Sequence, residues 1–191
     1  MPKRFVCAVA LALLFTSLSP AAAKAEPTPL GRKLNAYVEC INRLSERSYE
    51  SRARYFSWVG KNGPTGKESI IYGTYEIYDT ADCKRGVEEV GSLEPRDGEL
   101  EAAGATYVAA VVALEPLLKE ARAYYAEQDY KDDKMAKGKA MHPRLVAAWT
   151  AFASADQALR ARLETLQDAR AAEQLAEIER TEGRKAHYHI Q

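Results

Sequence analysis

The stretch most capable of chemistry is residues 124–143, YYAEQDYKDDKMAKGKAMHP, which brings together four acids, four lysines and a histidine. A calcium loop of the EF-hand kind needs acids at alternate positions, a central glycine and a later glutamate, and this stretch lacks that order. A short helix capped by Asp129 explains it instead, with acids in its first turn and lysines in its last turn, as the helix dipole favours. These residues are Asp132, Asp133, Lys137 and Lys139. We therefore predict a charged corner of the fold and no metal loop.

The three histidines, His142, His187 and His189, do not have the spacing of a metal site carried on one helix. His142 precedes a proline, and we interpret it as a helix-capping residue. No GxSxG or HExxH motif occurs. The stretch GPTGKES resembles a phosphate-binding loop, but it lacks the four-residue gap that must precede the Gly-Lys step. We therefore predict no catalytic residue, no metal site and no bound cofactor.

Asp156 is the most informative polar residue, because it lies between Phe152 and Leu159 on the apolar stripe of a predicted helix. A buried carboxylate must pair, become protonated or contact water. We interpret Asp156 as a residue that fixes the register of packed helices, with contact to a ligand as the alternative. The partners considered on the facing helices are Tyr107, Tyr125 and Arg52.

The tyrosines form two groups whose rings could stack on sugars of a cell envelope. Packing in the core, with the hydroxyls at its rim, is the alternative that we favour. The first group is Tyr72, Tyr75 and Tyr78, and the second group is Tyr124, Tyr125 and Tyr130.

Three long segments carry apolar or small residues at alternating steps of four and three, which predicts three long helices. The first helix covers residues 30–58. The second opens at Asp97, where acids in its first turn suit the helix dipole, and Pro116 inside it predicts a kink. The third has Pro143 in its first turn and ends at Gly183.

Each apolar stripe must pack against the others or remain in contact with water. The sequence therefore predicts an all-α fold, an antiparallel helical bundle of three long helices with one or two short connecting helices. We assign residues 26–183 to this single domain and residues 184–191 to a flexible C-terminal tail.

Glycines and a proline predict a loop at residues 60–66, after the first helix. The next stretch, residues 70–78, is rich in isoleucine and tyrosine and could form a strand, but no second strand candidate offers it a partner. We therefore predict an irregular or helical structure for it. Asp79 then caps a short helix that carries Cys83 and ends near Gly91.

Cys40 and Cys83 are the cysteines that remain once the N-terminal segment is removed. An even pair in an exported chain predicts one disulfide, which would attach the first long helix to the segment after the first loop. Two separate buried thiols are the alternative. A metal site would need a CxxC motif or a neighbouring histidine, and neither accompanies these residues.

Residues 1–25 have the organisation of a cleavable secretory signal peptide, with basic residues, an apolar run and then small residues. Cleavage is expected after Ala25, with a cut after Ala23 as the alternative. The apolar run is shorter than the roughly 20 residues that a membrane span needs, and we expect no other span in the mature chain. Because Cys7 lies inside this run, away from a lipid-attachment point, we predict a periplasmic protein without a lipid anchor.

Removal of the signal peptide takes away Lys3, Arg4 and Lys24 and no acid. The mature chain then has 24 basic and 27 acidic residues, a formal charge of −3. A nucleic-acid partner would demand a basic face, so this class of partner is excluded. We expect an envelope protein or a small ligand as partner, and the sequence gives no oligomeric state.

The string from Tyr124 to Asp156, the loop NGPTGKESIIYG and the positions of the two cysteines resemble the YiiG-like family of exported bacterial proteins, a domain family of unknown function. The resemblance covers roughly residues 34–183. It implies an α-helical exported domain, often lipid-anchored, with no established activity. This chain lacks a lipid-attachment cysteine, and family members continue with further helices where this sequence stops. We interpret it as a shortened form with a surface exposed near its end.

These patterns favour a non-enzymatic binding or interaction module of the bacterial envelope. The highly charged end of the third helix, residues 168–182, is able to dock another helix. The alternative is a hydrolase or metal-dependent enzyme with a site in the bundle core around Asp156. Such a site needs paired carboxylates that face inward from neighbouring helices, and the predicted stripes hold only one.

Overall fold

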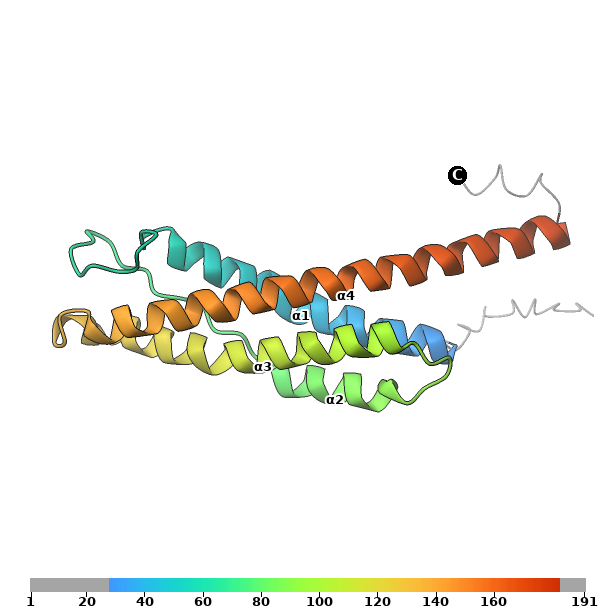
Figure 1. Ribbon diagram of the computed structural model, residues 1–191, viewed down its shortest axis with the longest axis horizontal. Helices are drawn as coiled ribbons and strands as arrows, with labels where there is room; N and C mark the ends of the chain where they lie inside the picture. Colours follow the sequence, from blue (N-terminus) through green and yellow to red (C-terminus); the bar gives the residue numbers. More distant parts are fainter. Residues whose placement is uncertain (1–27, 183–191) are drawn as a thin grey trace, which may run out of the picture.

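The computed structural model describes residues 28–182, which fold into four α-helices and one short 3-10 helix, without a strand. The all-α prediction is therefore confirmed. Figure 1 shows α3 and α4 side by side and running in opposite directions, joined by the turn that contains η1. The elements are α1 (Pro29–Phe56), α2 (Thr80–Gly91), α3 (Gly98–Ala126), η1 (Asp129–Lys131) and α4 (Ala136–Glu182). The predicted signal peptide, the C-terminal tail, His187 and His189 lie outside the described residues.

The core lies where α1 and α2 pack against the α3–α4 pair. α1 approaches α3 closely at Gly104, because a Cβ atom at this position would lie 2.1 Å from Cε1 of Tyr37. The apolar stripes predicted from the sequence supply the buried side chains. They include Leu34, Tyr37, Ile41 and Leu44 from α1, Leu100, Tyr107, Val111, Leu114 and Leu118 from α3, and Leu145, Trp149, Phe152, Leu159 and Leu163 from α4.

Of the two aspartates predicted to cap helices, Asp97 caps α3 and Asp79 does not cap α2. The Asp97 carboxylate accepts the backbone N–H of Leu100 at 2.8 Å, as expected of the residue that caps α3. Asp79 precedes α2 as predicted, but its backbone is left-handed (φ 64°) and its side chain makes no capping hydrogen bond. The Asp79 carboxylate instead lies 4.0 Å from Arg43 of α1.

The charged corner differs from the short helix predicted for it. Only Asp129–Lys131 form a 3-10 turn, and the left-handed residues Lys134 and Met135 separate this turn from α4. The Asp133 carboxylate accepts the N–H groups of Ala136 and Lys137, the first residues of α4, so it serves the next helix. The lysines predicted for the end of a short helix therefore lie at the start of α4.

α4 begins seven residues before Pro143, so the prediction of a first-turn proline is wrong. The segment before the proline is nevertheless helical, because Met135 and Met141 are buried and hold it against the core. At its other end, α4 extends beyond the remaining helices (Figure 1), and no residue between 164 and 181 is buried.

Residues 70–79, called the strap below, have no regular secondary structure, as the prediction of an irregular segment allowed. The Ser51 hydroxyl of α1 donates to the carbonyl of Tyr75 at 2.8 Å and accepts its N–H at 3.0 Å. On the other side, the Thr74 hydroxyl donates to the Leu118 carbonyl of α3 at 3.2 Å. The Ser51 side chain thus satisfies strap backbone groups that a strand would pair with another strand, and the Thr74 side chain attaches the strap to α3.

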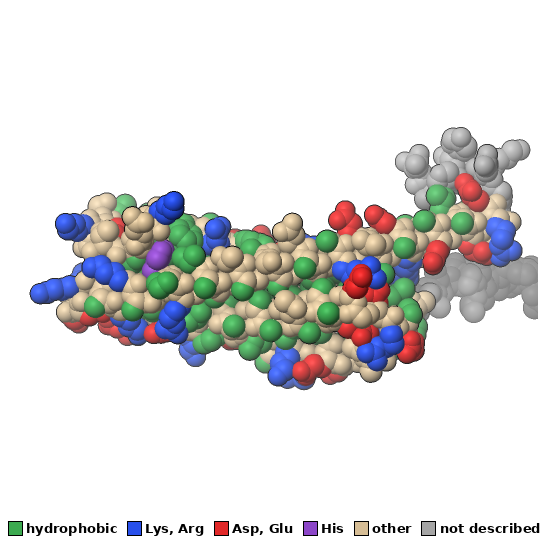
Figure 2. All heavy atoms as spheres, viewed as in Figure 1, with side chains coloured by type: hydrophobic (Ala, Val, Ile, Leu, Met, Phe, Trp, Pro, Cys, Tyr) green, Lys and Arg blue, Asp and Glu red, His purple; other side chains and the backbone are tan. Residues whose placement is uncertain are grey.

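Among the described residues, α3 is long and apolar enough to cross a membrane by length and composition, contrary to the expectation that no other segment would be. The buried stripe of a bundle helix has the same composition. On the face of the molecule drawn in Figure 2, charged side chains gather towards the two ends, and mainly uncharged residues lie between them. α3 contributes to this uncharged middle part, because its residues 102–114 carry no charged side chain.

Candidate functional site

Asp156 lies in the interior, with 3% of its surface exposed. Its carboxylate accepts hydrogen bonds from Ser45 Oγ at 2.6 Å, from the Tyr49 hydroxyl at 3.0 Å and from Arg160 Nε at 2.9 Å. Because Ser45 gives its proton to Asp156, its oxygen accepts from the Tyr107 hydroxyl, 2.9 Å away. Tyr107 therefore reaches Asp156 only through Ser45. Two donors come from α1, so the Asp156 carboxylate links α4 to α1.

The two tyrosines of this network keep their protons at neutral pH. Burial, followed by the bond to Asp156, raises the pKa of Tyr49. Burial also raises the pKa of Tyr107 to about 12. Between residues 28 and 182, five surface pockets are lined by other residues than Asp156. The contacts of Asp156 with two donors of α1 are those expected of a register-fixing residue, and this role stays a prediction, as does the alternative of a ligand contact.

The other partners considered for Asp156 lie elsewhere. The Tyr125 ring packs against Trp58, with centroids 5.0 Å apart, and the Arg52 guanidinium lies 5.3 Å from the Phe56 ring centroid. The sequence predicted correctly that these residues lie on helices that face α4. It could not show how each helix is rotated about its own axis.

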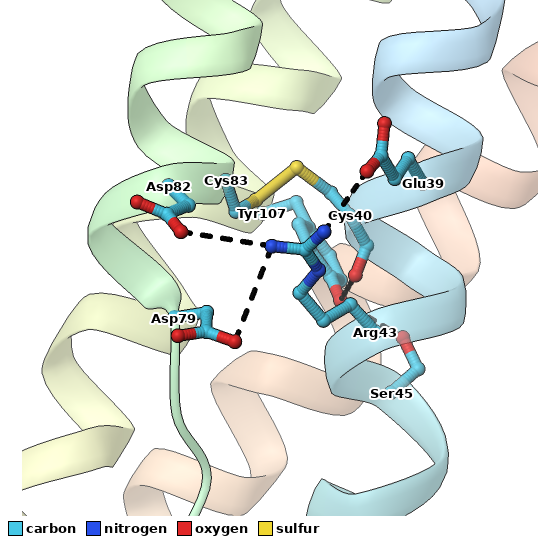
Figure 3. The surroundings of a disulfide bond; sticks show 8 residues. All are labelled: Glu39, Cys40, Arg43, Ser45, Asp79, Asp82, Cys83 and Tyr107. Carbon is cyan, nitrogen blue, oxygen red and sulfur yellow. Dashed lines mark hydrogen bonds and ion pairs between the residues drawn. A yellow bond between two sulfur atoms is a disulfide. The ribbon is translucent and has the colours of Figure 1, made fainter.

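Cys40 of α1 and Cys83 of α2 form a disulfide, with their Cα atoms 5.1 Å apart (Figure 3). Both cysteines are 4% exposed. Beside the disulfide, the Arg43 guanidinium lies 2.9 Å from the Glu39 carboxylate and 3.7 Å from the Asp82 carboxylate. A covalent bond and ion pairs therefore attach α2 to α1, and the short helix α2 has a fixed position despite its length.

The loop that resembles a phosphate-binding loop uses its donors internally. The Glu68 carboxylate accepts the N–H groups of Thr65 at 2.6 Å and Gly66 at 2.8 Å, and the Thr65 hydroxyl at 2.8 Å. Burial raises the pKa of Glu68, but these hydrogen bonds outweigh it and the pKa is lowered. The loop therefore holds its own anion where a phosphate would bind.

His142 lies within α4 and does not cap a helix, so that prediction is wrong. Its Nδ1 atom is 3.1 Å from the Tyr55 hydroxyl. Gly63 packs over the ring, because a Cβ atom there would lie 3.1 Å from it. Within residues 28–182, no group of three or more His, Cys, Asp or Glu side chains is placed to hold a metal ion.

The feature best suited to binding is the arginine–tyrosine site, formed by Arg47 and Arg54 of α1 with Tyr72 and Tyr75 of the strap. Arg54 donates from Nε to the Tyr72 carbonyl at 2.9 Å and from a terminal nitrogen to the Tyr75 hydroxyl at 3.1 Å. The Arg47 guanidinium lies 3.7 Å from the centroid of the Tyr75 ring, and that of Arg54 lies 4.6 Å from it. Two cations thus contact one aromatic ring.

A pocket of about 460 Å³ opens at this site between α1, the strap and α3. Besides the four residues of the site, Tyr78 of the strap and Arg122 of α3 line it. A second hollow, of about 510 Å³, is lined by the same four residues together with Glu50, Ala53 and Ser57. The four residues of the site therefore form the wall that the two pockets share, called the ridge below.

The ridge carries more positive than negative charge. Arg47 lies 3.0 Å from the Glu50 carboxylate, and Arg122 lies 2.6 Å from the Glu76 carboxylate. Arg54 has no carboxylate within 4 Å among the residues of the described range, and its charge faces tyrosine rings and a carbonyl. A guanidinium with free donors at a pocket wall can bind a carboxylate or phosphate in two-pronged geometry.

The tyrosines of the first group are thus divided between two roles. Tyr72 and Tyr78 are 49% and 59% exposed, while Tyr75 is partly covered by the arginines. Tyr124 and Tyr125 of the second group are buried, as the core interpretation predicted. The two arginines were missed in the sequence, although their separation by seven residues indicates that they share one face of α1.

Comparisons with known proteins identify a family without an established activity. Residues 28–191 match the model of a family described as protein of unknown function DUF3829. The chain is also 33% identical over 168 residues to Uncharacterized protein YiiG of Escherichia coli (strain K12). The match covers 86% of this chain and 48% of that relative, so the chain spans about half of the relative's length. No solved structure matches. The chain therefore belongs to the DUF3829 family of proteins of unknown function, and it is similar to YiiG.

Proposed function

We propose that this protein is an exported, non-enzymatic binding module of the bacterial envelope, and that its ligand is an anion held at the arginine–tyrosine site. The observation that carries the proposal is Arg54, a guanidinium without a carboxylate partner in the described chain, beside the exposed ring of Tyr72. The signal-like sequence at residues 1–25 and the disulfide support the exported location.

The compartment narrows the chemistry of the ligand. Fragments of the envelope glycan carry carboxylates on N-acetylated sugars, and the C–H face of a sugar ring can pack on an exposed tyrosine. The carboxylate would bind the half-buried Arg54 and the sugar would contact the exposed ring of Tyr72, so the two groups of the site act together.

Calorimetric titration of the purified protein with a muropeptide, a disaccharide bearing a peptide with free carboxylates, tests this proposal. Arg54→Gln should weaken binding by about tenfold or more, because a charged hydrogen bond contributes about 1.5–3 kcal/mol. Arg54 also bonds the strap, so Arg47→Gln is the second variant and should weaken binding without releasing the Tyr72 carbonyl. Arg52→Gln removes the same charge from α1 outside both pockets and should leave the affinity unchanged.

Absence of binding at millimolar muropeptide would contradict the proposed ligand class. Equal losses in the Arg47, Arg54 and Arg52 variants would contradict the site, because attraction to overall charge would then account for binding. Export is tested separately by fractionating cells that produce the full chain. Recovery of the oxidised protein in the periplasmic extract is expected, and recovery with free thiols in the cytoplasm would contradict it.

A further inference from the structure

We infer that the arginine–tyrosine site binds a linear glycan that carries carboxylates, and that the chain lies across the ridge and occupies both pockets. This inference rests on the proposed function and specifies the form of the ligand. The geometry that carries it is the shared wall, because Arg47, Arg54, Tyr72 and Tyr75 line both pockets.

The two pockets offer different surfaces on the two sides of the ridge. The pocket towards α3 has the exposed ring of Tyr78 and the Arg122–Glu76 ion pair. The pocket along α1 is lined by Glu50, Ala53 and Ser57, which are small or polar. A sugar that stacks on Tyr78 would therefore fill the first pocket, and the next units of the chain would follow the α1 surface in the second.

The charge at the ridge fits one anionic group at the junction of the two pockets. Arg54 lies at the centre, bonded to the Tyr72 carbonyl and the Tyr75 hydroxyl, and has no carboxylate of its own in the described residues. Carboxylates on Glu50 and Glu76 flank it on the two sides and neutralise Arg47 and Arg122. A chain with one carboxylate per few sugars matches this spacing of charges better than a polyanion charged at every unit, which would meet the flanking acids.

The wall itself is suited to a sugar chain because it is aromatic and exposed. Tyr72 presents about half of its surface to solvent, and its hydroxyl can hydrogen-bond to ring substituents while its face packs on C–H groups. An open ridge between two hollows contacts a long ligand along its length, whereas a compact ligand would fill only one hollow.

Titrations with muropeptides of increasing glycan length, from disaccharide to tetrasaccharide and hexasaccharide, test the inference. The tetrasaccharide should bind about fivefold more tightly than the disaccharide, the gain of one further ring contact. Ala53→Trp fills the α1 pocket and should abolish this gain, so that the variant binds the disaccharide and the tetrasaccharide with equal affinity. Ala161→Trp, at an exposed position of α4, should leave both affinities as in the unmodified protein.

The outcomes separate this inference from the proposed function. If the disaccharide and the longer chains bind with equal affinity and Arg54→Gln weakens both, the two-pocket inference is overturned and the proposed function stands. If no muropeptide binds, both fail. Tighter binding of hexaglutamate or of a single-stranded hexathymidylate than of the tetrasaccharide would overturn the glycan class, because peptide or nucleic acid would then be the preferred chain.

Discussion

Substitution of Asp156 is the sharpest test of how the helices are held in register. Asp156→Ala removes an acceptor that serves three donors, of which only Ser45 is fully buried. Tyr49 is 38% exposed and the Arg160 side chain is 51% exposed, so both can bond to water once the carboxylate is gone. The buried Ser45 hydroxyl cannot bond to water in this way, and it loses its hydrogen bond to the charged carboxylate.

The expected loss follows from these differences. A hydrogen bond to a charged group contributes about 1.5–3 kcal/mol, and the donors that regain water return part of it. We therefore expect Asp156→Ala to lower the free energy of unfolding by about 2–4 kcal/mol, which for a domain of this size lowers Tm by roughly 5–15 °C. Asp156→Asn keeps one acceptor and the side-chain shape, so its loss should be about half as large.

Urea unfolding at pH 7, followed by circular dichroism at 222 nm, measures the change. Asp168→Ala is the matched control, because it removes an exposed carboxylate from the same helix and should change the free energy of unfolding by less than about 0.5 kcal/mol. A loss below about 1 kcal/mol for Asp156→Ala, or one equal to the control, would refute the register role. Lost muropeptide binding with unchanged stability would instead support the alternative of a ligand contact.

Three further predictions concern the packing, the disulfide and the acid limit of stability. Gly104→Ala should cost about 1–3 kcal/mol in urea unfolding, since the new methyl group collides with the buried Tyr37 ring, while Gly98→Ala meets open space and should cost little. Reduction of the disulfide, whose cysteines are 43 residues apart, should lower the unfolding free energy by about 4 kcal/mol, measured as a lower urea midpoint with reductant. Hydrogen bonds from Arg162, which outweigh burial, hold the pKa of Asp97 below its ordinary value. The folded state then binds fewer protons than the unfolded state, so this stability is present above about pH 4 and is lost as the pH falls through the folded pKa. Asp97→Asn should flatten that part of the stability curve.

The long helices could be predicted because each carries a repeated stripe that must be buried. The stripe of α3, from Leu100 to Leu118, shows the four-and-three spacing in the sequence and is fully buried in the structure. The charged corner could not be predicted in the same way, because its charges suit a short helix as well as a turn that serves the next helix. The deciding residues were Lys134 and Met135, whose left-handed backbone interrupts the helix. Such a conformation depends on the burial of Met135, a tertiary effect that local spacing does not contain.

The sequence predicted the tyrosines of the candidate site but not its arginines. The tyrosines at 72, 75 and 78 indicated an aromatic surface, but which rings face solvent depends on how the strap is attached to α1. Asp156 was correctly placed in the interior, yet its donors Ser45 and Tyr49 were missed because the rotation of α1 about its axis is set by packing. Arg54 was missed for the same reason, because the sequence does not indicate which groups a surface arginine contacts.

The strap explains why a binding site would form at this end of the bundle. α2 is held against α1 by the disulfide and lies along only part of α3, and the strap passes alongside a further part of α3 (Figure 1). A helix in that place would satisfy its own backbone, whereas the strap depends on Ser51 and Arg54 for that purpose. Because Arg54 of α1 holds the irregular backbone of the strap, its guanidinium lies at the surface of α1. The exposed Tyr72 of the strap lies beside it. The same residues that complete the fold therefore create the charged aromatic ridge on which the proposed binding depends.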